Sequence, residues 1–199
     1  MKFVSLIVKT IFFIGLLIIS PIIFFFCIII FIEDGLPIFF IQNRLGKNEK
    51  IFKLYKIRTM LKEAPNVGTH NITKNYFLKI GGFLRKYKID ELPQICNYIN
   101  GDINIIGPRP GLPNQKRLLS CRRKNNIFKI KPGITGLGQV LGFDMSNPDL
   151  LSDIDDLYIK KKSTKIDLLI FFSTFFKFSK KKLLTVLEYE INQIKKNNV

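Results

Sequence analysis

The chain has 199 residues and a formal net charge of +17, from 32 lysine and arginine residues against 15 aspartate and glutamate residues. This length allows one ordinary domain plus an appendage, and the charge indicates anionic partners such as phosphorylated substrates, an anionic membrane surface or nucleic acid. Three cysteines without CxxC spacing, and His70 as the single histidine, argue against a disulfide framework or a histidine-based metal cluster and favour a reducing compartment.

A long apolar stretch lies near the N-terminus. Residues 10–32 carry no charge and are mostly isoleucine, leucine and phenylalanine. The stretch is long enough to insert into a membrane and too long for a cleavable signal peptide. The excess of lysine and arginine beyond it predicts that the rest of the chain stays in the cytoplasm.

The middle of this stretch carries Ser20-Pro21. Pro21 lacks an amide hydrogen and crowds the carbonyl of Leu17, so the helix is expected to break or bend there, and the Ser20 hydroxyl can satisfy a freed carbonyl. Two alternatives follow: a kinked helix that spans the bilayer, and a helix-break-helix hairpin that enters and leaves by the cytoplasmic face. Taken alone, the residues favour the spanning helix.

Beyond the apolar stretch, the pattern changes to short strands and loops. Two β-prone runs, 37–42 and 51–58, flank a turn-forming segment at 43–48 and predict a small β-hairpin. Residues 62–75 are polar and contain proline and glycine, so we expect a loop there. Apolar residues then recur at helical spacing and predict a helix over 73–87.

A second helix is expected directly after the first. Asp90 would cap this helix, Pro93 would lie in its first turn and Gly101 would end it. Asp90 and Glu91 would then lie at a helix N-terminus, where the backbone dipole favours negative charge. The expected buried face comprises Leu92, Ile95, Cys96 and Ile99.

The C-terminal half begins with a basic segment. Residues 113–126 predict an exposed basic helix, 131–136 a loop or turn, and Val140-Leu141 part of a short strand. The apolar segment 166–178 is too short to span a bilayer and is bracketed by lysines. It predicts either a helix lying in the membrane interface or a core helix, and the residues favour neither.

Another helix is expected to begin at Ser146 or Asn147, with Pro148 in its first position. Its expected apolar face comprises Leu150, Ile154, Leu157 and Tyr158. The same segment carries an acidic run, which we interpret as a solvated face and not as a metal site. The run comprises Asp149, Asp153, Asp155 and Asp156.

Asp90 and Glu91 are the candidate catalytic residues. A carboxylate can act as nucleophile, general base or metal ligand, and Mg²⁺ prefers one or two carboxylates together with phosphate oxygens. Two adjacent carboxylates repel each other, so both stay ionised only beside cations or a metal ion. For an isolated pair, simple helix capping is the more frequent explanation. The candidate cations for charge compensation and phosphate binding are Lys56, Arg58, Arg85, Arg109 and Lys131.

Several motifs occur together along the chain. They are Ile57-Arg58-Thr59-Met60, Gly82-Phe83-Leu84-Arg85-Lys86, Asp90-Glu91-Leu92-Pro93-Gln94, Asn100-Gly101-Asp102, Gly107-Pro108-Arg109-Pro110 and Lys131-Pro132-Gly133-Ile134-Thr135-Gly136. In order and spacing they resemble the bacterial sugar transferases, the monotopic phosphoglycosyl transferases that begin surface-glycan assembly. The resemblance covers nearly the whole chain, and the joint occurrence of so many motifs is highly specific.

The resemblance implies a function. Asp90 would attack the sugar-bearing phosphate of a UDP-sugar and release UMP, and a polyprenyl phosphate, such as undecaprenyl phosphate, would then take the phosphosugar from the enzyme. Glu91, beside Asp90, would bind or organise Mg²⁺, and Arg85 and Arg109 would hold phosphates. The enzyme would lie at the cytoplasmic face of the bacterial inner membrane, with Ser20-Pro21 as the break of a re-entrant hairpin and not the middle of a spanning helix.

The chain also departs from the family. Leu141-Gly142-Phe143-Asp144 stands where the family often has a basic residue, so a basic contact at Phe143 is missing or supplied elsewhere. The chain has no tryptophan, although the family commonly places some near the interface. We expect the chain to be a minimal catalytic form, without the extra N-terminal helices of larger members.

Together these observations predict a mostly helical α+β monotopic membrane protein, with a small β-hairpin and interfacial amphipathic helices. Residues 1–34 would form the membrane-inserted re-entrant hairpin, and 35–199 the cytoplasmic, membrane-associated catalytic domain. The alternative is a non-enzymatic, membrane-tethered basic module that binds anionic lipid or nucleic acid, but no basic motif interleaved with aromatic residues supports nucleic-acid binding. The residues identify neither the sugar and its glycan pathway nor the oligomeric state.

Overall fold

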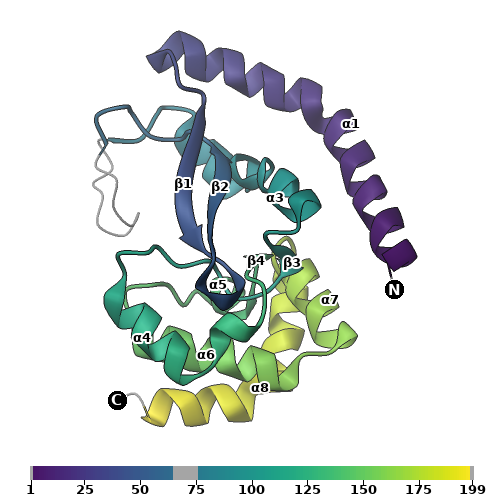
Figure 1. The fold of residues 1–199 in the computed structure, drawn as a ribbon, viewed down its shortest axis with the longest axis vertical. Coiled ribbons are helices and arrows are strands. Elements are labelled where there is room, and N and C mark those ends of the chain that lie inside the picture. The colour runs from purple at the N-terminus through teal and green to yellow at the C-terminus, as the bar shows by residue number, and fades with distance from the viewer. Residues whose placement is uncertain (1, 65–75, 198–199) are drawn as a thin grey trace. The chain divides into compact units, whose positions relative to one another are not determined.

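The computed structural model describes residues 2–64 and 76–197, so His70 and the expected start of a helix at residue 73 lie outside the described residues. The chain forms two compact units. The first comprises Met1–Gln42 and Lys53–Gly101, and the second comprises Asn43–Phe52 and Asp102–Val199. The described part is mostly helical, with two small two-stranded sheets (Figure 1).

The apolar N-terminal stretch forms one helix, α1 (Lys2–Asp34), which continues through Pro21. The Ser20 hydroxyl donates to the Leu17 carbonyl at 2.7 Å, as expected for the carbonyl that proline leaves free. Figure 1 shows the axis of α1 changing direction along its length. The helix therefore bends and does not stop at Ser20-Pro21, and the re-entrant path through a membrane stays a prediction.

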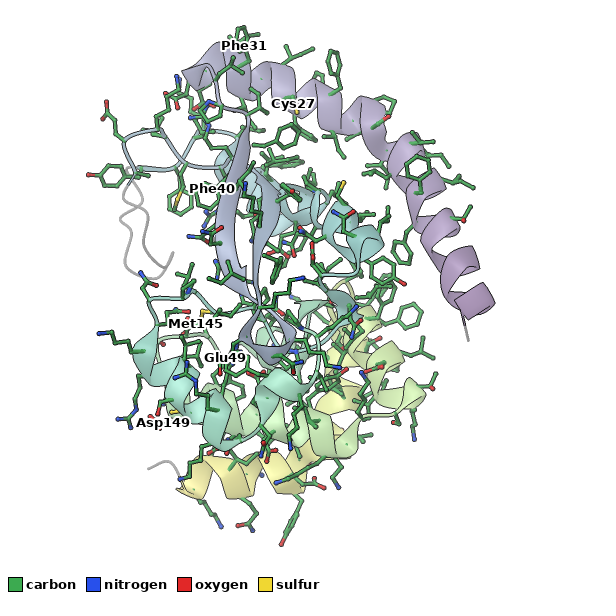
Figure 2. The ribbon with its side chains drawn as sticks, in the orientation of Figure 1. Cys27, Phe31, Phe40, Glu49, Met145 and Asp149 are labelled. Atoms are coloured by element: carbon green, nitrogen blue, oxygen red, sulfur yellow. The ribbon has the colours of Figure 1, made fainter. Side chains whose placement is uncertain are left out.

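Many of the apolar side chains of α1 that the structure describes are exposed. Among those described side chains, Phe26 and Ile30 are buried, and they pack in the core of the first unit against Ile57, Leu78 and Leu84. Phe31, labelled in Figure 2, is 55% exposed. Of the described helices, α1 is the one that is long and apolar enough to cross a membrane, over Phe12–Asp34. Such an exposed apolar surface is typical of a membrane-associated helix.

The predicted β-hairpin is confirmed. Its strands are β1 (Phe39–Leu45) and β2 (Ile51–Ile57), and the 3-10 turn η1 (Lys47–Glu49) lies between them. The first strand is longer than the sequence pattern indicated, and the turn is correspondingly shorter. Each strand contributes residues to both units.

The helix expected over 73–87 is wrong for the described residues before Gly81. Among residues 76–87, the α-helix is α2 (Gly81–Lys86), and Phe77 instead pairs with Met60 in an antiparallel bridge. The Leu78 amide also donates to the Thr59 carbonyl at 3.1 Å. Residues 77 and 78 thus use their backbone to bind the segment after β2, a long-range contact that overrides the helical spacing of the apolar residues.

The next helix, α3 (Gln94–Asn100), begins later than expected, with Pro93 at its N-cap. Asp90 does not cap it, because Asp90 lies in a separate 3-10 turn, η4 (Ile89–Glu91). Gly101 ends α3 in the left-handed conformation, as predicted. The expected buried face is also wrong in part, since Cys96 is exposed and the polar Gln94 and Asn97 are buried.

A parallel strand pair organises the second unit. Strand β3 (Asn104–Ile106) pairs with β4 (Gly133–Thr135), in the register Asn104 to Gly133 and Ile106 to Thr135. The expected loop at 131–136 therefore contains a strand. The expected strand at Val140-Leu141 is wrong, because these residues form the end of helix α5 (Leu137–Leu141).

The remaining helices build the core of the second unit. Asn147 caps α6 by accepting from the Leu150 amide, and Pro148 is its first residue, as predicted. Ile166 and Ile170 of α7 are buried in this core, whereas Leu168 and Phe172 are exposed, so α7 is a core helix with one uncovered apolar face. Whether that face lies in a membrane interface stays a prediction. The bounds are α4 (Lys116–Lys124), η5 (Ile127–Lys129), α6 (Pro148–Lys161), α7 (Thr164–Ser173) and α8 (Lys177–Asn197).

Two charged residues contradict the expected solvated faces. Arg122 of the basic helix α4 and Asp155 of the acidic run are each 2% exposed, and they pair at 2.6 Å. Their pairing offsets the cost of burying each charge, because a buried charge is tolerated only beside a partner of opposite sign. Asp149 of the same run is exposed (Figure 2) and pairs with the exposed Arg117.

Candidate active site

Asp90 and Glu91 are buried although both are acidic, with 6% and 8% of their surface exposed. They belong to η4, which follows a sharp turn at Lys88, whose φ of +60° lies in the left-handed region. A side chain with a Cβ is strained in that conformation. The Glu91 amide donates back to the Lys88 carbonyl, so the turn holds both carboxylates in one short segment.

Lys56 of β2 supplies the first cation at this pair. Its Nζ donates to Glu91 Oε1 at 2.9 Å, and Lys88 Nζ lies 3.8 Å from Glu91 Oε2. The Lys56 side chain is only 16% exposed, so water screens this contact less than it would screen a surface ion pair. The predicted closeness of Lys56 to the carboxylate pair is therefore observed.

Asn97 fixes the strand that carries Lys56. Its Oδ1 accepts from the Tyr55 amide at 3.1 Å, and its Nδ2 donates to the Lys53 carbonyl at 2.7 Å. The fully buried Asn97 carboxamide thus makes hydrogen bonds to the β2 backbone of the kind that a neighbouring strand would make. The sequence interpretation missed this residue, because its strand partners are more than 40 positions away.

The pKa of the Asp90 carboxyl is shifted by its burial and by the charges around it. Burial raises the pKa of Asp90 and the nearby Glu91 charge acts in the same direction, while the positive charges of Lys56, Arg85 and Lys88 oppose the rise. Within the described part of the chain, Asp90 Oδ1 is a buried oxygen without a hydrogen-bond partner. Such an acceptor is costly to leave unpaired in a folded chain, so Asp90 Oδ1 is a candidate for binding a ligand.

Arg85 is held in place by its contacts with Thr59 and Phe77. Its Nε donates to Thr59 Oγ1 at 2.8 Å, and its guanidinium lies 4.6 Å from the centre of the Phe77 ring, a favourable cation–π contact. Gly81 allows the close approach of α2, because a Cβ there would collide with the Thr59 carbonyl oxygen. Arg85 thus contributes positive charge near Asp90 from a fixed position.

Arg58 is engaged away from the carboxylate pair. Its guanidinium binds the Asp34 carboxylate and donates to the Gly35 carbonyl at 2.6 Å. It is 5% exposed. Phosphate binding by Arg58 stays a prediction, and these contacts indicate a different role that is argued below.

The donor set fits Mg²⁺ better than a transition metal. No group of three or more histidine, cysteine, aspartate or glutamate residues that could hold a metal ion occurs among the described residues. Mg²⁺ does not need one, because it prefers one or two carboxylates together with phosphate oxygens and water. The Asp90–Glu91 pair and the unpartnered Asp90 Oδ1 meet that requirement.

Arg109 and Lys131 belong to the second unit and lie on its β3–β4 loops. The loop of Arg109 follows β3, and its backbone is fixed from several sides. Gly107 donates to the Thr135 carbonyl at 3.0 Å and Gly133 to the Pro108 carbonyl at 2.9 Å. Arg122 Nη1 donates to the Arg109 carbonyl at 2.7 Å, which connects the loop to the buried ion pair. That Arg109 and Lys131 bind phosphates beside Asp90 stays a prediction.

Comparison with known proteins decides the family. Residues 2–181 match the sequence profile of the family described as "Bacterial sugar transferase". The chain belongs to the bacterial sugar transferase family. Its enzyme class, phosphoglycosyl transferase, agrees with the names of its curated relatives.

Three relatives illustrate the range of this sugar transferase family. The chain is 36% identical over 151 residues to the uncharacterized sugar transferase EpsL of Bacillus subtilis (strain 168), covering 76% of this chain and 74% of EpsL. It is 33% identical to a "UDP-N-acetylgalactosamine-undecaprenyl-phosphate N-acetylgalactosaminephosphotransferase" of Aeromonas hydrophila, covering 78% of this chain and 38% of the relative. It is also 33% identical to a "UDP-glucose:undecaprenyl-phosphate glucose-1-phosphate transferase" of Klebsiella pneumoniae, covering 81% and 37%. The chain thus spans most of EpsL and little more than a third of the other two.

Within this sugar transferase, the structure brings together Asp90, Glu91, Lys56 and Arg85. All four lie in the first unit, on β2, α2 and η4. Thr59 and Asn97 also belong to this group and were not identified from the sequence as site residues. Thr59 follows Arg58 in one of the motifs that carry the family resemblance. Its place in that motif is the sequence signal that could have identified it as a site residue.

Proposed function

We propose that this sugar transferase moves a phosphosugar from a UDP-sugar to a polyprenyl phosphate, such as undecaprenyl phosphate, and releases UMP. The observation that carries the proposal is the buried Asp90–Glu91 pair, with Lys56 at 2.9 Å from Glu91 and one Asp90 oxygen unpartnered. Relatives named for this reaction support it. The reaction would begin the assembly of a surface polysaccharide or glycoconjugate.

Asp90 is the nucleophile in this scheme. One of its carboxylate oxygens forms a bond to the phosphorus that carries the sugar, and the bond from that phosphorus to the bridging oxygen of the diphosphate breaks. UMP leaves with the bridging oxygen and the electron pair. The sugar phosphate remains bound to Asp90 as an acyl phosphate, which divides one transfer into two easier steps.

The second step regenerates the enzyme. A phosphate oxygen of the polyprenyl phosphate attacks the same phosphorus, and the bond to the Asp90 oxygen breaks. The product is a polyprenyl diphosphate sugar, and Asp90 returns to its carboxylate form. This order separates a water-soluble donor from a lipid acceptor, so one site can serve both in turn.

Positive charge is needed because a carboxylate must approach an anionic diphosphate. Glu91 and Asp90 would hold Mg²⁺, which when bound supplies charge neutralisation at the phosphate oxygens. Lys56 orients Glu91 through its hydrogen bond, and Arg85 adds a fixed positive charge near Asp90. Arg109 and Lys131 would bind donor or acceptor phosphates, for which a planar guanidinium is well suited.

The test of the proposed function is UMP release from a panel of UDP-sugars by the purified protein in lipid nanodiscs with polyprenyl phosphate. We expect release with at least one UDP-sugar, dependence on Mg²⁺, and loss of release when EDTA is added. A panel is needed because relatives named for N-acetylgalactosamine and for glucose are equally similar to this chain. No release with any UDP-sugar in the presence of Mg²⁺ would overturn the proposal.

We further propose that α1 enters and leaves the membrane by the cytoplasmic face, so that the enzyme lies on the inner membrane. The curved axis of α1 (Figure 1), the presence of Pro21 inside the helix and the exposed apolar side chains of α1 support this path. A cysteine introduced at Phe3 is expected to react with a membrane-impermeant maleimide only after the cytoplasmic side is opened. Labelling from the periplasmic side of intact cells would instead favour a spanning helix.

A further inference from the structure

The C-terminal end of α1 carries two acidic residues, Glu33 and Asp34, and no basic residue in its last turn. Negative charge at a helix C-terminus opposes the helix dipole, so these residues do not stabilise α1 by themselves. They are also the first charged residues after the apolar stretch. Negative charge at the C-terminus of α1 is unfavourable for the helix, so it needs a stabilising partner outside the helix.

Both carboxylates find that partner in the first unit. Asp34 binds the guanidinium of Arg58 and accepts from the Lys62 amide at 3.2 Å. Glu33 Oε1 accepts from the Lys79 amide at 2.6 Å. The end of α1 is thus bound both to the segment after β2 and to the residues just before α2.

Arg58 also binds the helix end through its backbone. Its Nη2 donates to the Gly35 carbonyl at 2.6 Å and to the Asp34 carbonyl at 3.3 Å. These are carbonyl oxygens that a helix leaves without a partner at its C-terminus. A buried arginine that satisfies one carboxylate and two carbonyls is a built clamp, which we name the exit clamp (Glu33, Asp34, Gly35 and Arg58).

The exit clamp is continuous with the supports of the active site. Thr59, next to Arg58, accepts from Arg85 Nε at 2.8 Å, and Arg85 lies on α2, which packs against the turn η4 that carries Asp90. The core adds a second connection, because Phe26 and Ile30 of α1 pack with Leu84, the residue before Arg85. A shift of the α1 end would therefore move Arg85 relative to Asp90.

We propose that Asp34 and Arg58 are positioning residues that couple the exit of the membrane helix to the alignment of Arg85 with Asp90. The inference rests on the proposed function and deepens it: Arg58 acts through Thr59 and Arg85 and does not bind a substrate phosphate. The membrane-embedded helix is then part of the support of the active site. The position of α1 within the first unit then affects kcat.

The deciding experiment is a double-mutant cycle of Asp34→Ala and Arg58→Gln, with UMP release measured in nanodiscs. Each single variant is expected to lower kcat roughly tenfold, as a small misplacement of a catalytic group does, with an unchanged KM for the UDP-sugar. The double variant is expected to be no slower than the slower single variant, since both remove one contact. Arg58→Lys should resemble Arg58→Gln, because an ammonium group cannot bind one carboxylate and two carbonyls in a fork.

A phosphate-binding Arg58 gives the opposite results. Arg58→Gln would raise the KM for the UDP-sugar about tenfold, Arg58→Lys would keep most of the activity, and Asp34→Ala would behave as wild type. Any of these three results overturns the inference. The matched control is Asp149→Ala, which removes the carboxylate of an exposed Arg–Asp pair (Figure 2) and is expected to leave kcat unchanged.

A second measurement keeps the inference testable if no UDP-sugar is a substrate. The Lys62 amide donates to Asp34 and the Leu78 amide donates to Thr59. Hydrogen exchange at both amides is expected to become roughly tenfold faster in Asp34→Ala and to stay unchanged in Asp149→Ala. Unchanged exchange at both amides in Asp34→Ala would overturn the exit clamp, whatever the outcome of the activity measurements.

Discussion

Replacing Asp90 with asparagine is expected to reduce UMP release at least about a thousandfold, because the variant lacks the oxygen nucleophile on which both chemical steps depend. Asparagine has nearly the same shape, so the packing around residue 90 and Glu91 should be kept. The Asp90 carboxyl is buried and makes no hydrogen bond through Oδ1, so its removal is not expected to weaken the fold. UMP release at saturating UDP-sugar and Mg²⁺ measures the effect.

The control for this prediction is Glu91→Gln. Glu91 would act through Mg²⁺ and through its contact with Lys56. The fall in UMP release should therefore be smaller for Glu91→Gln than for Asp90→Asn, and it should depend on the Mg²⁺ concentration. UMP release by Asp90→Asn should stay low at every Mg²⁺ concentration. If Asp90→Asn kept wild-type turnover, or if added Mg²⁺ restored it, Asp90 would not be the nucleophile.

Replacing Asp155 with alanine is expected to lower the free energy of unfolding by about 3–5 kcal/mol, because it leaves the Arg122 guanidinium buried without its partner. Asp155 accepts from Arg122 Nε at 3.1 Å and from Nη2 at 2.6 Å, and both side chains are almost fully buried. For a chain of this size the change corresponds to a fall of roughly 6–20 °C in Tm. Thermal unfolding of the detergent-solubilised protein measures it.

Two further variants separate the buried pair from surface charge. Asp149→Ala removes the partner of Arg117 at the surface, where an ion pair contributes little, and should lower Tm by no more than about 2 °C. Replacing both members of the buried pair, in Arg122→Met with Asp155→Leu, should recover much of the loss, since no unpaired charge remains. Equal Tm values for Asp155→Ala and Asp149→Ala would show that the burial of the pair contributes nothing to stability.

Features carried by adjacent residues could be predicted from the sequence. The apolar stretch gave α1, the turn-forming residues between two β-prone runs gave the hairpin, and Asn147-Pro148 gave the start of α6. Each of these signals acts within a few residues along the chain. The Asp90–Glu91 pair was identified from its motif, and Lys56 was identified as a basic residue of the predicted hairpin. The local structure around them was not predicted.

Features set by distant partners could not be predicted in this way. The spacing of apolar residues before α2 predicted a helix, but Phe77 forms a bridge with Met60 there. Val140 lies in a helix where a strand was expected. Arg122 was expected on an exposed helix, and Asn97 was not part of the expected buried face, but both are buried with partners on other elements. A polar residue at a buried position has no local signal, because its hydrogen-bond partner determines the burial.

The glycines of the β3–β4 pair have a consequence for how the loop of Arg109 can vary. A Cβ at Gly133 or at Gly136 would collide with backbone atoms of Gly107, so the segments meet without side chains between them. Their spacing is fixed by peptide geometry and is independent of the volumes of neighbouring core residues. Mutations elsewhere in the core can therefore accumulate while the loop of Arg109 keeps its shape, which makes this part of the enzyme robust to sequence drift.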